Sequence, residues 1–325
     1  MLARLRPYIE IARIDHWFKN VFMALGILVA LFYEPDTIAG IGWRLVVAVL
    51  ATCLVASSNY VLNEVLDAAT DRLHPTKRNR PVPAGRVHIP TALVEWLALA
   101  AAGFALAFTI NVPFAGAAIA LWIMGLIYNV RPIRAKELPY LDVITESINN
   151  PIRLLLGWFL LIPDKLPSIS LLLSYWALGA FFMATKRLAE LREIGDRAVA
   201  ARYRRSFAFY TEERLLVSLL FYISACAFFG GVFIVRCKLE LVLFVPVAAG
   251  HFAYYLALGL APHSPVQNPE KLYKARGFLL YTLFAFAFFV ALMFTRIPML
   301  YDLFNFDAPK TPSLWVLEAW PRHGG

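Results

Sequence analysis

The chain alternates long apolar stretches with short polar segments. Nine of the apolar stretches have a spanning or near-spanning length for an α-helix in a lipid bilayer. They cover about residues 20–33, 45–62, 92–110, 114–128, 140–162, 168–185, 215–235, 241–261 and 278–295. This pattern predicts an all-α, polytopic membrane protein with about nine transmembrane helices.

The composition agrees with that prediction. Of the 325 residues, 60% are hydrophobic and only 16% are charged, and the mean hydropathy is +0.63. Such values lie outside the range of soluble domains. Nothing suggests a second folded unit, so we expect one transmembrane domain over 1–295 that carries any active site. Its cytoplasmic loops would be 64–90 and 186–214, and 296–325 would be a C-terminal extracytoplasmic tail.

Basic residues are distributed unevenly along the chain. With the N-terminus in the cytoplasm, 23 of the 31 Lys and Arg residues lie in cytoplasmic segments and seven in outer segments. The positive-inside rule favours this orientation. The net charge of +9 then reflects topology first, and anionic substrates or lipid headgroups second. We expect a multi-pass protein of the inner (plasma) membrane with its site facing the cytoplasm, membrane lipid around it and no nucleic-acid partner. The oligomeric state stays open.

A polar stripe closes the second apolar stretch. Asn59, Asn63 and Asp67 follow one another at intervals of four, and Asp71 comes one turn later. This spacing places them on one side of a helix. Mg²⁺ binds through one or two carboxylates together with substrate phosphate oxygens, so the stripe predicts a magnesium site at Asn63, Asp67 and Asp71. The alternative is a solvated helix end with Asp71 paired to a neighbouring Arg.

A basic loop follows the stripe directly. Lys77, Arg78 and Arg80 lie within four positions, and His74 precedes them. Such cations bind phosphate oxygens through charge-assisted hydrogen bonds. Prolines and a glycine after them would stiffen the loop over a site. A loop that only satisfies the positive-inside rule has a similar composition, but it needs no such order of acidic, basic and stiffening residues.

The fifth apolar stretch carries a polar face. Asp142, Glu146, Asn149, Asn150 and Arg153 recur at intervals of three and four, apart from the adjacent asparagines. Ionisable groups inside a membrane are costly and indicate a functional cavity. In the structural alternative, Glu146 and Arg153 only neutralise partners on other helices. Either interpretation turns this face toward the interior of the bundle.

The sixth apolar stretch ends in a cluster of mixed charge. Lys186, Arg187 and Glu190 lie near the expected cytoplasmic level of the acidic stripe. They form either a second phosphate-binding cluster or ordinary surface ion pairs. The long basic segment after them, which includes Tyr203 and Tyr210, is typical of an amphipathic segment that lies at the headgroups or caps a cavity.

Other catalytic motifs are missing from the sequence. It contains no P-loop, no glycine-rich dinucleotide fingerprint and no nucleophile elbow, and its six histidines are not spaced like zinc ligands. The three cysteines imply neither a metal site nor a disulfide framework. Covalent catalysis is therefore not the first hypothesis.

At these residues the chain resembles the UbiA-type superfamily of intramembrane prenyltransferases. The resemblance implies a ring of nine helices around a lipid-accessible cavity, with two Asp-rich motifs facing the cytoplasm. The first motif, Asn-x-x-x-Asp-x-x-x-Asp, is matched by Asn63, Asp67 and Asp71. The second motif departs from the family, because Lys186-Arg187-x-x-Glu190 replaces its usual pair of Asp.

With this departure, the chain resembles one branch of the superfamily, the decaprenyl-phosphate phosphoribosyltransferases. The stretches that carry the similarity run in patches over about residues 13–295. They include Trp17-Phe-Lys19-Asn20, the segment from His74 to Pro81, Ile152-Arg153, the segment from Lys186 to Leu191, and Ser206-x-x-x-Tyr210-Thr. Residues 154–157 differ from the small-residue run of that branch, so the shape of the acceptor cavity is expected to differ.

The resemblance implies a Mg²⁺-dependent transfer of 5-phosphoribose from phosphoribosyl diphosphate to a polyprenyl phosphate. Asp67 and Asp71 would act through the metal, and Arg153 would bring the lipid phosphate to the anomeric carbon. The remaining substrate-binding residues would be Lys19, Asn20, His74, Lys77, Arg78, Arg80, Glu146, Lys186, Arg187, Glu190 and Tyr210.

The sequence is also compatible with two other functions. A true prenyltransferase would use the same metal but would move a polyprenyl chain from its diphosphate to an aromatic or other small acceptor. A second Mg²⁺ would then lack its carboxylates, because the second motif is basic. A lipid-binding or scaffolding protein would not need the Asn63, Asp67 and Asp71 stripe in register.

Overall fold

The computed structural model describes residues 2–72, 77–267, 272 and 274–304. Within this part of the chain every regular element is an α-helix or a short 3₁₀ helix. The longer helices are α1 (Leu2–Ile11), α2 (Met23–Tyr33), α3 (Ile41–Asp71), α4 (Ile89–Ile110), α5 (Val112–Asn129), α6 (Leu141–Phe159), α7 (Ile169–Ile194), α9 (Glu212–Cys237), α10 (Val245–Leu260) and α11 (Arg276–Phe294). The shorter elements are η1 (Ile14–Phe22), η2 (Pro35–Ile38), η3 (Lys77–Asn79), η4 (Ala135–Glu137), α8 (Arg197–Tyr203), η5 (Arg205–Ala208), η6 (Leu239–Phe244), η7 (Pro265–Gln267) and α12 (Pro298–Leu303).

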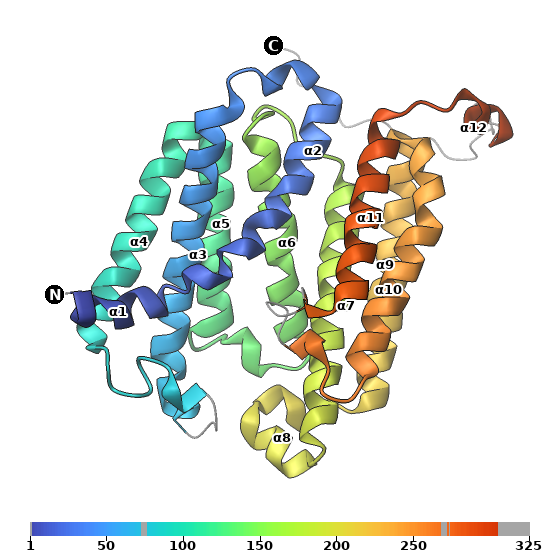
Figure 1. Cartoon of the computed structure of the whole chain (residues 1–325). Helices are drawn as coiled ribbons and strands as arrows, with labels where there is room; N and C mark the ends of the chain where they lie inside the picture. The colour runs from blue at the N-terminus through green and yellow to red at the C-terminus, as the bar shows by residue number, and fades with distance from the viewer. Residues whose placement is uncertain (1, 73–76, 268–271, 273, 305–325) are drawn as a thin grey trace, which may run out of the picture.

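The predicted helical membrane fold is confirmed, and the count of nine is approximate. Among the described residues, eight helical stretches are long and apolar enough to cross a bilayer. The remaining predicted stretch, 140–162, is the fifth along the chain and forms α6, whose polar face carries Asp142, Glu146 and Arg153. Figure 1 shows α6 upright between α5 and α7, among the other long helices.

The chain runs up and down through the bundle. From α3 to α7 each long helix packs against the next, α7 packs against α9 and α10, and α10 packs against α11. Figure 1 shows the α3–α4 loop, the α5–α6 loop and α8 at the lower end of the bundle, and α12 at the upper end. The segments predicted to be cytoplasmic therefore gather at one end. The helix α1 lies across the upright helices near that end.

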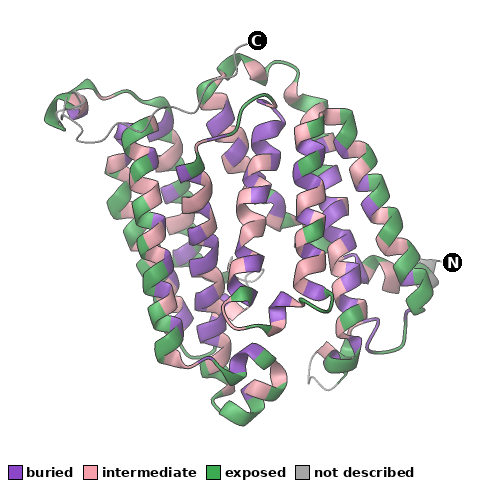
Figure 2. Cartoon of the chain, turned by 180° about the vertical axis from the view of Figure 1, so that it is seen from behind, coloured by how far each residue is buried: buried purple, intermediate pink, exposed green. Residues whose placement is uncertain are grey.

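The sides of the helices differ in exposure. Buried residues concentrate where helices face one another, and exposed residues lie along the outside and at the ends (Figure 2). Many exposed side chains on the long helices are large and apolar, such as Val94, Phe108, Phe228 and Phe284. An apolar outer surface around a bundle is what a surrounding bilayer requires.

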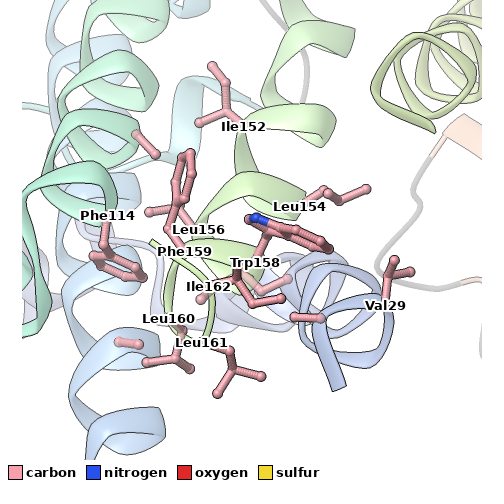
Figure 3. Packing of buried hydrophobic residues seen from close by; sticks show 14 of the residues in the cluster. Val29, Phe114, Ile152, Leu154, Leu156, Trp158, Phe159, Leu160, Leu161 and Ile162 are labelled. Carbon is pink, nitrogen blue, oxygen red and sulfur yellow. The ribbon is translucent and has the colours of Figure 1, made fainter. Parts of the chain in front are cut away.

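The largest buried cluster joins α2, α5 and α6 at the end of the bundle away from the basic loops. Figure 3 shows Phe114, Leu156, Trp158 and their neighbours in this cluster. The backbones of α2 and α6 almost touch there. A Cβ on Gly26 would lie 2.0 Å from the Leu154 carbonyl oxygen, and one on Gly157 would lie 2.0 Å from the Met23 carbonyl oxygen. Small residues permit such close helix contacts in membranes.

This contact gives a stability prediction. Gly157→Ala should destabilise the protein by roughly 1–3 kcal/mol, because the α2 backbone must move away from the new methyl group. Gly116→Ala on α5 is the matched control, since nothing lies within 4 Å of its Cβ position. The midpoint of thermal unfolding in detergent measures both. Equal midpoints for the two variants would contradict the close packing of α2 on α6.

Candidate active site

The first predicted motif forms the last turns of α3. Asn63 Nδ2 donates to Asp67 Oδ2 at 3.2 Å and to Asn129 Oδ1 at the end of α5. Asp71, one turn after Asp67, is buried with 5% of its surface exposed. The structure therefore brings Asn63 and Asp67 into contact and places Asp71 on the next turn.

Two cations that the sequence analysis did not single out contact Asp67. Arg134 Nη2 lies 2.9 Å from Asp67 Oδ1, and Lys136 Nζ lies 2.5 Å from the same oxygen. Lys136 also donates to Asn129 Oδ1 at 2.9 Å. Burial lowers the pKa of Lys136 to about 8, against the opposing effect of Asp67. The α5–α6 loop thus supplies positive charge directly at the predicted metal ligand.

Asp71 is paired as well. Arg80 Nη1 donates to Asp71 Oδ2 at 2.6 Å, so the ion pair anticipated by the solvated-helix alternative is present. The loop that carries Arg80 is anchored by buried Glu64, whose Oε1 accepts from the backbone N–H of Val82 at 3.1 Å. Arg13 lies 3.8 Å from the other oxygen of Glu64. A hollow of about 920 Å³ beneath α1 is lined in part by Arg13, Glu64 and Arg80.

The rest of the basic loop is placed only in part. Lys77 Nζ lies 3.4 Å from Tyr203 Oη and 5.1 Å from the centre of its ring, so this loop meets α8 across the end of the bundle. Arg78 is exposed. His74 lies outside the described residues, and its predicted role stays a prediction.

The two faces of α6 differ in polarity, as predicted. Arg153 donates from Nε to Asn20 Oδ1 at 3.1 Å and from Nη1 to the Asn149 carbonyl at 3.3 Å. Within the described residues no carboxylate forms an ion pair with Arg153. The opposite face of α6 lines an apolar hollow of about 370 Å³ that includes Trp176 of α7.

Other predicted residues lie around Arg153. Tyr60 of α3 interacts electrostatically with both Arg153 and Glu146, and its ring centre lies 5.9 Å from Lys19 Nζ. Asn20 donates onward to Cys53 Sγ at 3.2 Å. Lys19, Asn20, Glu146 and Arg153 therefore form one polar group that joins η1, α3 and α6.

The second predicted cluster is built around Asp142 of α6, which has no exposed surface. Its oxygens accept from Arg187 Nε at 3.1 Å, from Ser206 Oγ at 3.3 Å and from Tyr210 Oη at 2.5 Å. Tyr210 also accepts from the Tyr140 backbone N–H at 2.6 Å. Burial and the negative charge of Asp142 raise the pKa of Tyr210. Asp142 thus ties α6, α7 and the segment before α9 together.

Arg187 is buried and paired with protein groups, whereas its predicted phosphate-binding role requires a side chain that substrate can reach. It is buried with 2% of its surface exposed, and its Nη1 donates to Glu190 Oε2 at 2.8 Å. A third contact joins Nη2 to Tyr128 Oη at 3.5 Å. In contrast, Lys186 has no hydrogen bond or ion pair within the described part of the chain. Lys186 rather than Arg187 is therefore available for an anion.

The oxygen-rich stripe on α3 fits a magnesium ion by its chemistry. Two carboxylates and an amide oxygen are hard donors, and substrate phosphates complete such a site. Among the described residues no group of three His, Cys, Asp or Glu side chains is arranged for a metal, so within them a magnesium ion would also need the Asn63 amide oxygen and substrate phosphate oxygens. Metal ligation would require the Asn63 amide to turn its oxygen toward Asp67 and the paired cations to move aside.

The chain resembles known proteins in both sequence and fold. Residues 21–273 match the model of the UbiA prenyltransferase family. The chain belongs to this family. Its helices also match the structure of a UbiA homolog from Archaeoglobus fulgidus bound to GPP and Mg²⁺. That match has a TM-score of 0.64 and 18% identity, and it covers 86% of this chain and 99% of the homolog. At this identity, the likeness supports the fold alone.

Two bacterial proteins that share one name are similar in sequence to this chain. The decaprenyl-phosphate phosphoribosyltransferase of Mycolicibacterium smegmatis is 31% identical over 213 residues, which are 64% of this chain and 63% of the relative. The Corynebacterium glutamicum protein of that name is 30% identical over 230 residues, which are 65% of this chain and 60% of the relative. The matched part thus spans somewhat less than two thirds of either relative.

The buried position of Arg187 gives a prediction. Arg187→Met should lower the free energy of unfolding by about 3–5 kcal/mol, because Asp142 and Glu190 lose their main buried counterion. Arg192→Gln is the control, since its pair with Glu212 is largely exposed and contributes little. Thermal unfolding in detergent measures both variants. A folded Arg187→Met protein with an unchanged midpoint and a raised substrate KM would instead support the phosphate-binding role.

Proposed function

We propose that this UbiA-family member is an enzyme that transfers 5-phosphoribose from phosphoribosyl diphosphate to a polyprenyl phosphate and releases diphosphate. The reaction would depend on Mg²⁺ held by Asn63, Asp67 and Asp71. The proposal extends the names of the two bacterial relatives to this chain. It also places the site on the cytoplasmic side of the inner (plasma) membrane, because the basic segments gather at that end of the bundle. Residues 1–295 would form the catalytic domain, with 296–325 outside it.

The observation that carries the proposal is the positive character of the second cluster. Where the family resemblance suggests a second pair of Asp, α7 places Lys186 and Arg187, and Arg204 interacts electrostatically with both. Arg187 is paired with Asp142 and Glu190, so Lys186 and Arg204 supply the positive charge that a phosphate could use. Such a cluster is poorly suited to a second Mg²⁺ and well suited to a phosphate group. Phosphoribosyl diphosphate carries a phosphate at each end of its sugar, and a prenyl diphosphate carries phosphates at only one end.

Several residues of this chain would have separate roles in the transfer reaction. Bound Mg²⁺ neutralises diphosphate charge and so makes diphosphate a better leaving group. Asp67 and Asp71 would hold the diphosphate end of the donor through the Mg²⁺ that their carboxylates would bind. The bond between C1 and the diphosphate oxygen then breaks, and its electron pair leaves with diphosphate as positive charge develops on the ribose. An oxygen of the lipid phosphate forms the new bond to C1.

Arg153 is suited to guide the acceptor. A lipid phosphate is already an anionic nucleophile, so it needs a cation that brings it beside C1 and no strong general base. Arg153 has partners in Asn20 and the Asn149 carbonyl but no carboxylate counterion within the described residues. Its guanidinium therefore keeps hydrogen-bonding capacity for phosphate oxygens.

A prenyltransferase activity is the second candidate, because the family itself is described by that chemistry. One assay separates the two. Purified protein is incubated with Mg²⁺, phosphoribosyl diphosphate and a polyprenyl phosphate, and mass spectrometry looks for the phosphoribosyl lipid, with EDTA as control. We expect product that disappears with EDTA. Turnover of a prenyl diphosphate with an aromatic acceptor, without phosphoribosyl lipid, would contradict the proposal.

The metal role predicts a loss of activity in two variants. Asp67→Asn and Asp71→Asn should each lower kcat by at least about 100-fold, because diphosphate departs without full charge neutralisation. Asp164→Asn is the matched control, since Asp164 is exposed in the α6–α7 loop at the opposite end of the bundle. Rates within a few-fold of wild type in folded Asp67→Asn and Asp71→Asn would remove the two carboxylates from the mechanism.

The role of Arg153 predicts an effect on the acceptor alone. Arg153→Gln should raise the KM for polyprenyl phosphate by about tenfold, because a charge-assisted hydrogen bond is lost. The KM for phosphoribosyl diphosphate should stay within about twofold of wild type. The KM of Arg153→Lys for polyprenyl phosphate should lie between those of wild type and Arg153→Gln, since lysine keeps the charge and loses the planar pair of donors. A raised donor KM with a normal acceptor KM would assign Arg153 to the other substrate.

A further inference from the structure

Arg204 is held in an unusual position for a residue of a connecting segment. It lies between α8 and η5 in extended backbone, with φ −150° and ψ 127°. Its side chain is 20% exposed, and its Nη1 lies 3.5 Å from Asp142 Oδ2. That nitrogen is buried and makes no hydrogen bond within the described part of the chain. A guanidinium nitrogen buried in this way lacks a partner that it normally has.

Asp142 already has several donors, and two of them share the oxygen that lies nearest Arg204. Its oxygens accept hydrogen bonds from Arg187, Ser206 and Tyr210, so Arg204 contributes charge there without a hydrogen bond. Leaving a buried donor unsatisfied costs free energy. An anion that entered beside Arg204 would recover this cost by accepting from Nη1.

Arg204 also stands between the two clusters. It interacts electrostatically with Lys186 and Glu190 on the α7 side and with Lys136, the partner of Asp67, on the α3 side. Lys186 has no hydrogen bond or ion pair of its own within the described residues. Two cations with unused hydrogen-bonding capacity therefore interact electrostatically with each other near the Asp142 cluster.

We infer that Arg204, together with Lys186, binds the 5-phosphate of the sugar donor and so selects phosphoribosyl diphosphate over prenyl diphosphates. This inference rests on the proposed function. The diphosphate end of the donor lies at Asp67 and Asp71, and the 5-phosphate at the far end of the ribose meets Arg204 and Lys186. A prenyl diphosphate has no group for this second position, and its apolar chain would leave Lys186 unpaired and Arg204 Nη1 without a hydrogen bond.

The segment around Arg204 provides matched controls. Arg205 is 80% exposed and lies 3.6 Å from Glu137, and Arg202 is exposed with its Nε bonded to the Ala198 carbonyl. Arg202→Gln and Arg205→Gln therefore remove the same charge from the same segment without touching the Asp142 cluster. A purely long-range charge effect would appear in all three glutamine variants.

The test uses a fragment that carries only the 5-phosphate. Binding of ribose 5-phosphate is measured by isothermal titration calorimetry on the purified full chain in detergent with EDTA. We expect wild type to bind it, Arg204→Gln to bind at least about tenfold more weakly, and Arg202→Gln and Arg205→Gln to stay within about twofold. Binding of Mg²⁺ with methylene diphosphonate should be equal in all four proteins, which also shows that each is folded. Arg204→Lys should bind ribose 5-phosphate with intermediate affinity.

The outcomes separate this inference from the proposed function. If wild type makes phosphoribosyl lipid but Arg204→Gln binds ribose 5-phosphate as tightly as wild type, the Arg204 assignment is overturned and the function stands. If wild type makes no phosphoribosyl lipid and does not bind ribose 5-phosphate, both are overturned. If Arg202→Gln and Arg205→Gln weaken the binding of ribose 5-phosphate as much as Arg204→Gln does, the loss reflects net charge alone. That result would also overturn the assignment.

Discussion

The buried carboxylate of Asp142 is the interaction on which the polar end of the bundle depends. A charge without solvent contact persists in a protein only when it is paired and hydrogen-bonded. Asp142 satisfies this condition with donors from α7, from the α8–η5 segment and from Tyr210. Because these donors come from different parts of the chain, one carboxylate fixes the position of α6, α7 and the segment that carries Arg204. The positive side of the site is built on this anchor.

The remaining charges form a balance that a substrate would change. Asp67 is neutralised by Arg134 and Lys136, and Asp71 by Arg80. These cations occupy the place of the positive charge that Mg²⁺ would bring. Under the proposed function, Asp67 and Asp71 would hold Mg²⁺ together with the donor's diphosphate, and the cations now paired with them would be free to bind phosphate oxygens. A site with interleaved charges of both signs therefore suits a metal diphosphate better than a metal alone.

Much of the fold follows from the sequence. The stretch 140–162 predicted α6 and its polar face, because apolar length and helical spacing are local properties. The same reasoning missed α1 and η1, which are too short to span a bilayer. It also missed Lys136 and Arg134, whose contact with Asp67 arises only when the α5–α6 loop folds back onto α3. Arg187 has the sequence context of a phosphate ligand, yet its buried contacts with Asp142 and Glu190 depend on tertiary packing.

We propose a site for a donor that carries phosphates at both ends, with one metal ion between the protein and the diphosphate. Competitive titration of the wild-type protein with phosphoribosyl diphosphate and geranyl diphosphate, each with and without Mg²⁺, tests it most directly. We expect phosphoribosyl diphosphate to bind more tightly than geranyl diphosphate, and Mg²⁺ to strengthen the binding of phosphoribosyl diphosphate. Tighter, Mg²⁺-dependent binding of geranyl diphosphate, with no measurable affinity for phosphoribosyl diphosphate, would contradict it.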